Sequence, residues 1–315
     1  MIEFIQSLPS PIAQGMIWGL MAIGVYITYK ILDFADLTVD GSLGTGGAVL
    51  VVLTTQFNVN IYLALVAAFA AGCLAGFVTG ILHTKFGIPA ILSGILTQLA
   101  LYSINLGIMS GRANTTISWR NYKLIVSSKT DELFFTILKL IVIVGAIIAV
   151  LYWFFGTEIG RSIRATGCNQ NMSRANGINT DTTKIIGLVI SNGIVAVSGG
   201  LLSQFSGSAD VNMGRGAIVI GLAAVIIGEV VFGKLFNNFV LRLMSVVFGG
   251  IIYYIVIALV LKLGLNSNNL KLFSAAFVAV FLAIPYWKTK MAVKQPASKD
   301  KKTVSQKEVK GNAAN

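Results

Sequence analysis

Few side chains in this chain could perform chemistry. His83 is the only histidine, and Cys73 and Cys168 are the only cysteines. A catalytic site or a metal site of the common kinds needs several such groups held together. Cys73 lies in an apolar segment and Cys168 in a polar one, so we expect no disulfide between them. The sequence therefore favours neither an enzyme, nor a metal site, nor a bound cofactor.

One run of residues almost matches the motif of a phosphate-binding loop. Gly228 to Leu235 reads GEVVFGKL, whereas a nucleotide-binding loop has a serine or threonine after its lysine to hold magnesium. Leu235 occupies that position, and the run ends an apolar helix instead of joining a strand to a helix. We conclude that ATP hydrolysis connected with this chain must take place on a partner protein.

Polar side chains at helical spacing inside apolar segments are candidates for binding a transported molecule. Gln98, Tyr102 and Asn105 share one such segment, and Asn192 lies in another. Hydrogen bonding between helices explains any single one of them equally well. As a group, they are our candidates for a solute path.

Glu229 is the one acid inside the later apolar segments. An acid within a membrane is usually functional or paired, so two readings stay open: a functional role, or pairing with Lys234 near the membrane interface. Proton-driven carriers use chains of buried ionisable groups, which this sequence lacks. A secondary carrier that works alone is therefore only our alternative function.

The segments that contain these residues have the composition of a membrane protein. Hydrophobic residues make up 55% of the 315 residues, charged residues only 11%, and the mean hydropathy is +0.80. Soluble domains carry about 25% charged residues. We therefore predict an all-α, polytopic membrane bundle.

The net charge of +12 does not indicate nucleic acid binding, because many lysines lie in residues 288–315. We expect that segment to be a disordered cytoplasmic tail.

Hydropathy windows predict about nine membrane spans within residues 1–287, with eight or ten as alternatives. The predicted spans are Pro11–Tyr29, Leu37–Leu53, Ile61–Leu82, Ile88–Met109, Leu133–Phe155, Ile185–Gln204, Gly214–Gly233, Leu243–Leu261 and Leu270–Tyr286. The second is short and rich in glycine, so we expect a broken or only partly spanning helix. Similar acidic phrases at Asp36 and Asp210 precede the second and seventh spans. They suggest an internal repeat, although chance explains them as well.

The third predicted span carries a row of glycines. Gly72, Gly76 and Gly80 lie on one helical face, because steps of four residues drift little around a helix. Such a row lets another helix approach closely. We predict that this face packs against a neighbouring helix, with a chance arrangement facing lipid as the alternative.

The longest polar segment is residues 156–184, which separates two apolar ones. The pattern predicts a short amphipathic helix over Glu158–Cys168, with Ile159 and Ile163 on one face. The segment is either a solvated basic loop or a docking element for a soluble partner. The distribution of basic residues puts this segment and the C-terminus in the cytoplasm, and the N-terminus and Ser110–Glu132 outside.

This segment also resembles the cytoplasmic coupling loop of ABC importer permeases in the branched-chain amino-acid and ribose permease family. That loop has the pattern T-x-x-G-R-x-I-R-A, followed later by G-I-N or G-I-D. The matching residues are Thr157, Gly160, Arg161, Ile163, Arg164, Ala165, Gly177, Ile178 and Asn179. The likeness extends over about Gly15 to Gly233. The acidic phrase from Asp33 to Ser42 looks more like a subgroup described as tryptophan or tyrosine importers.

The resemblance implies a permease domain over residues 1–287 of an ATP-driven importer in a bacterial plasma membrane. Its solute would be small and polar, preferably an amino acid, with a sugar or a nucleoside as the alternative. Partners implied are a second permease subunit in a homodimer, cytoplasmic ABC ATPase subunits, an extracellular substrate-binding protein and membrane lipid. The implied ATPase-coupling residues are Glu158, Ile159, Gly160, Arg161, Ile163, Arg164, Ala165 and Gly177.

Overall fold

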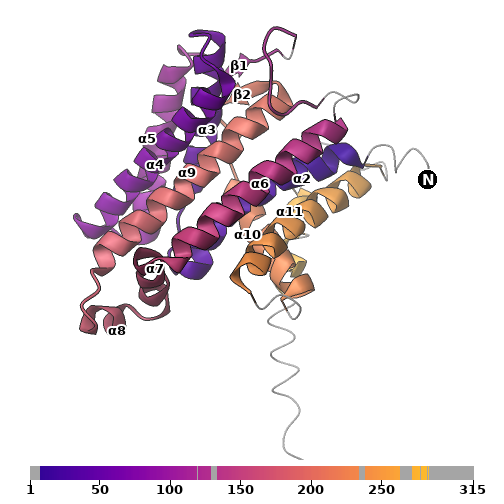
Figure 1. The fold of residues 1–315 in the computed structure, drawn as a ribbon. Helices are drawn as coiled ribbons and strands as arrows, with labels where there is room; N and C mark the ends of the chain where they lie inside the picture. Colours follow the sequence, from indigo (N-terminus) through magenta and orange to yellow (C-terminus); the bar gives the residue numbers. More distant parts are fainter. Residues whose placement is uncertain are drawn as a thin grey trace, which may run out of the picture.

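The structure, a computed structural model, describes residues 8–118, 120–128, 133–233, 238–262, 272–276, 278–281 and 283. The predicted tail and much of the ninth predicted span lie outside these residues. Long helices packed side by side form the molecule (Figure 1). The all-α expectation is confirmed, since the strands in the described residues are three residues long.

The helices follow one another along the chain, and the longest connection between them covers residues 109–132. They are α2 (Pro9–Tyr26) with its π-helical continuation η1 (Ile27–Ile31), α3 (Thr38–Thr55), α4 (Ile61–Thr84), α5 (Ala90–Ile108), α6 (Leu133–Gly156), α7 (Glu158–Cys168), α8 (Gln170–Ala175), α9 (Thr180–Ser206), α10 (Ala217–Phe232) and α11 (Phe239–Lys262). Two strands, β1 (Asn114–Thr116) and β2 (Ser208–Asp210), pair antiparallel at the end of the bundle opposite α7 and α8.

The prediction of about nine spans is not confirmed. Among the described residues, six helices are long and apolar enough to cross a membrane: α2 with η1, α4, α5, α6, α9 and α11. Two others, α3 and α10, have 18 and 16 residues and do not meet that standard. The chain is thus a polytopic bundle that contains both full-length and shorter helices.

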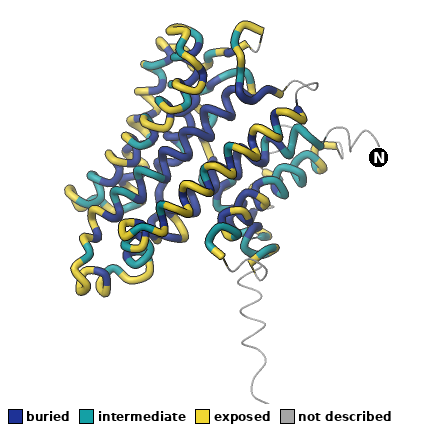
Figure 2. The backbone as a smooth tube through the Cα atoms, viewed as in Figure 1, coloured by how far each residue is buried: buried dark blue, intermediate teal, exposed yellow. Residues whose placement is uncertain are grey.

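The core is organised around α9, which packs against α2, α3 and α4. Figure 2 shows this helix buried along most of its length. The glycine row of α4 faces it, as the sequence predicts. A Cβ atom on Gly80 would lie 3.0 Å from Ile185 Cγ1, and Cβ atoms on Gly72 and Gly76 would overlap backbone carbonyls of α9. The two backbones are therefore in direct contact.

Of the two alternatives for the second span, the broken helix is wrong, because α3 is one continuous helix. A partly spanning helix stays a prediction, since α3 is not among the helices long and apolar enough to cross a membrane. Its glycines serve close packing instead of interrupting the helix. Gly46 lies against the backbone of Ala196, and the carbonyl of Leu43 lies against Gly199. In lipid a continuous helix satisfies its own backbone hydrogen bonds, so small residues are tolerated wherever a neighbouring helix covers them.

Candidate functional site

A buried polar network joins the start of α3 to the middle of α9. Asn192 is fully buried, and its Nδ2 donates to Asp36 Oδ2 at 2.7 Å. Asn192 Oδ1 accepts a hydrogen bond from Ser42 Oγ at 2.6 Å, while Asp36 Oδ1 accepts one from the Thr38 backbone N–H at 2.9 Å. Asn192, a candidate path residue, thus holds the segment before α3 in place. Its role in a solute path stays a prediction.

A second set of hydroxyls connects α3, α4 and α5. Thr38 Oγ1 lies 2.7 Å from Thr79 Oγ1, and Thr79 Oγ1 donates to Thr97 Oγ1 at 2.9 Å. All three threonines are buried. Sequence reasoning missed this set, because threonine at a single position does not reveal which helix it faces.

The three candidate path residues on α5 do not converge on one point. Asn105 is buried against α3, where a Cβ atom on Gly44 would lie 3.2 Å from its Nδ2. Tyr102 is 42% exposed and Gln98 is half-buried. The ring of Tyr102 has a neighbour that sequence reasoning did not single out: the Arg215 guanidinium carbon lies 6.0 Å from its centre.

Arg215 lies directly before α10, and its side chain is exposed. Asp40 Oδ2 accepts the Gly216 N–H and Oδ1 accepts the Ile218 N–H, both at 2.9 Å. Asp40, in the first turn of α3, thereby caps α10 from another helix. Ser42, half a turn further along α3, bonds Asn192 near the middle of α9. The start of α10 therefore lies level with the middle of α9. Arg215, whose side chain is exposed, lies at the same level.

The predicted coupling helix exists with the predicted bounds, as α7. Thr157 caps it, since its Oγ1 accepts the Gly160 N–H at 3.3 Å. Gly160 is buried against the backbone of Phe155. Ile163 is 0% exposed, whereas Ile159 is 50% exposed. The predicted apolar face is therefore divided: Ile163 anchors the helix, and Ile159 stays on the surface.

The two arginines of α7 also differ. Arg164 turns inward: Nη2 donates to the Phe155 carbonyl, and its guanidinium lies 5.3 Å from the Phe239 ring centre. Arg161 is exposed and donates from Nε to the Gly156 carbonyl at 3.0 Å.

The remaining loop candidates flank this arrangement. Glu158 is exposed, Ala165 is half-buried, and Gly177 forms the turn between α8 and α9. The φ angle of Gly177 is +78°, a conformation that glycine adopts without strain.

Glu229 forms an ion pair with Lys30, a partner that the sequence analysis did not name. Lys30 Nζ lies 3.0 Å from Glu229 Oε1, which links η1 to the end of α10. Lys234 lies outside the described residues. The groups are 48% and 38% exposed, so the pair lies at the edge of the bundle.

The comparisons with known proteins decide the family. A family model described as the permease component of branched-chain amino acid transport systems matches residues 9–285. The chain belongs to this permease family. The tyrosine transport system permease protein of Clostridioides difficile (strain R20291) is 40% identical to it over 274 residues, covering 87% of this chain and 90% of that protein.

Two further relatives of the permease are less similar. An uncharacterised protein of Rickettsia prowazekii (strain Madrid E) is 33% identical over 261 residues, covering 82% of this chain and 90% of that protein. The ribose import permease protein RbsC of Haemophilus influenzae (strain ATCC 51907 / DSM 11121 / KW20 / Rd) is 26% identical over 216 residues, covering 68% of this chain and 66% of that protein.

Family membership settles the class of protein. The permease is the membrane component of an ABC transport system and does not hydrolyse ATP itself, because the ATPase is a separate subunit. Such a system implies ATPase and substrate-binding partners. Several apolar helices agree with a multi-pass protein of a bacterial plasma membrane.

Proposed function

We propose that the permease imports an amino acid and that Arg215 and Tyr102 lie on its solute path. The observation that carries this proposal is an exposed guanidinium level with the middle of α9, whose carbon lies 6.0 Å from the centre of an exposed aromatic ring. The tyrosine transport permease with 40% identity supports the solute class. The permease works as a pair of identical subunits, with the N-terminus outside and the C-terminus in the cytoplasm.

The position of the Arg215 guanidinium, level with the middle of a membrane helix, has to be explained. A guanidinium facing hydrocarbon is costly, and ionisable groups inside membranes mark substrate paths or paired sites. Within the described residues, the ion pairs are Lys30–Glu229 and Arg174–Asp181, neither of which includes Arg215. The face that carries Arg215 therefore suits an aqueous path shared with the second subunit. There the guanidinium can bind a carboxylate with two parallel hydrogen bonds.

The experiment measures uptake into proteoliposomes that contain the permease, its ATPase and its binding protein. Hydrogen bonds to charged groups contribute about 1.5–3 kcal/mol, so Arg215→Gln should lower uptake of the amino acid by roughly 10- to 150-fold. Arg112→Gln removes an exposed cation from the loop after α5 and is the matched control. Uptake of ribose but no amino acid, or equal uptake by wild type and Arg215→Gln, would refute the proposal.

The outer surface of α7 and α8 is the proposed contact with the ATPase. Glu158, Ile159 and Arg161 are exposed there, together with Met172 on α8. Ile163 and Arg164 support this surface from inside.

A charge reversal separates these roles. Arg161→Glu should leave the permease folded and uncouple ATP hydrolysis from uptake, because it reverses charge on the docking surface. Lys85→Glu makes the same change at the exposed end of α4 and should preserve coupling. Normal coupling in Arg161→Glu would contradict this assignment.

A further inference from the structure

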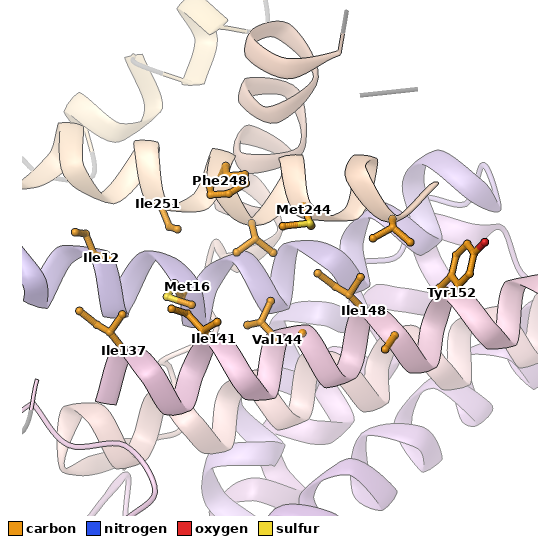
Figure 3. Close-up of a pocket in the computed structure, with 14 residues that line it drawn as sticks. Ile12, Met16, Ile137, Ile141, Val144, Ile148, Tyr152, Met244, Phe248 and Ile251 are labelled. Carbon is orange, nitrogen blue, oxygen red and sulfur yellow. The ribbon is translucent and has the colours of Figure 1, made fainter. Parts of the chain in front are cut away.

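A long apolar groove runs between α2, α6 and α11. Its volume is about 640 Å³, and the side chains that line it include Ile12, Met16, Ile141, Ile148, Met244 and Phe248. Figure 3 shows these side chains pointing into the groove from three helices, with Tyr152 at one end of the row. The groove follows the helices, so its shape suits an extended hydrocarbon chain.

The groove leads to a charged cavity at the α7 end of the bundle. Tyr152 also lines a neighbouring cavity of about 560 Å³, together with Arg164 and Phe239. Arg164 and Phe239 in turn line a third cavity of about 390 Å³, with Lys30 and Arg242. The three spaces therefore lie next to one another, because each shares lining residues with the next, from an apolar groove to a basic cavity.

The basic cavity has the charge of an anion site. Arg164, Arg242 and Lys30 contribute three cations from three different elements, α7, α11 and η1. Its described lining contains no acidic side chain. Glu229 holds Lys30 from the neighbouring side, and Tyr26 lines the cavity together with Arg242. The local excess of positive charge remains, since Arg164 makes no ion pair within the described residues.

We propose that these spaces together form a binding site for one anionic phospholipid. The phosphate of the headgroup lies between Arg164 and Arg242, and one acyl chain lies in the groove between α6 and α11. Basic pockets between membrane helices on the cytoplasmic side bind anionic headgroups. The exposed rings of Tyr152 and Trp153 mark the depth at which an acyl chain meets its headgroup.

The site has a consequence for α7. Arg164 belongs to this helix and reaches the headgroup cavity, while its partner Phe239 is the first residue of α11. A bound lipid therefore contacts both α7 and α11, and it should stabilise the position of α7.

The test measures thermal stabilisation of the purified permease by added lipid, and its bound lipid content by mass spectrometry. Phosphatidylglycerol should raise the melting temperature, whereas phosphatidylcholine with the same acyl chains and glycerol 3-phosphate should not. One cation near an anionic membrane surface contributes about 1 kcal/mol. Arg242→Gln should therefore weaken phosphatidylglycerol binding about fivefold. Arg242 is exposed, so this change spares the core.

Two alanines of α6 provide a matched pair for the groove. Ala149 lines it and Ala146 does not, although both are exposed. Ala149→Phe should abolish the stabilisation by phosphatidylglycerol, and Ala146→Phe should retain it. Equal stabilisation by phosphatidylcholine, or the whole effect from glycerol 3-phosphate, would overturn the proposal. So would a change of oligomeric state in Ala149→Phe, because a second copy of the chain would then occupy the groove.

Discussion

Replacing Gly76 with alanine tests the contact between α4 and α9 most directly. A Cβ atom at this position would overlap the Leu188 carbonyl and lie 3.0 Å from Val189 Cα. Both are backbone atoms, so no side-chain rotation relieves the overlap and the helices must separate. Overpacking of this kind typically costs about 1–3 kcal/mol. We expect the melting temperature to fall by roughly 2–10 °C, and further in Gly76→Leu.

The assay is thermal unfolding of the detergent-purified permease at one fixed heating rate, because membrane proteins often unfold irreversibly. Gly145→Ala is the matched control, since a Cβ atom at Gly145 in α6 would meet no atom within 4 Å. If Gly76→Ala and Gly145→Ala melt at the same temperature as wild type, α4 and α9 do not touch as the structure describes.

Three further predictions follow from the site. Asp40→Ala should destabilise the permease by about 1–2 kcal/mol because it removes the cap of α10, and Asp40→Asn should cost less in the same thermal assay; equal losses would show that the cap is not what matters. Glu229→Gln should cost less than about 1 kcal/mol, because its ion pair with Lys30 is partly exposed, and should leave uptake normal; lost uptake would reveal a second role. An impermeant thiol reagent applied to intact cells should label Arg112→Cys but not the native Cys168, which would be labelled only if the proposed orientation were reversed.

Local patterns were readable from the sequence, whereas contacts between helices were not. The bounds of α7 agree with the prediction because amphipathic spacing is a local signal, and the structure adds a cap at Thr157. The glycines of α4 and α3 look alike in sequence, yet the prediction of close packing held for the first and that of a break failed for the second. Only the position of α9 explains both.

The candidate site was predictable to a similar degree. Asn192 was recognised as polar within an apolar span, but its partners Asp36 and Ser42 are more than 140 residues away. Arg215 falls inside the seventh predicted span, Gly214–Gly233, but it was not singled out as a candidate residue. Its depth follows only from the bonds between Asp40 and α10.

The cap that Asp40 provides to α10 also constrains how the chain is assembled during synthesis. Asp40 is synthesised 176 residues before Gly216. When α3 is made, its partner α10 does not yet exist. The segment before α10 contains Asp210, Asn212 and Arg215 and is poorly suited to insert by hydrophobicity alone. The bonds from Asp40 to the start of α10 can form only after α3 is in place, so the polar approach to α10 is satisfied by a helix made much earlier.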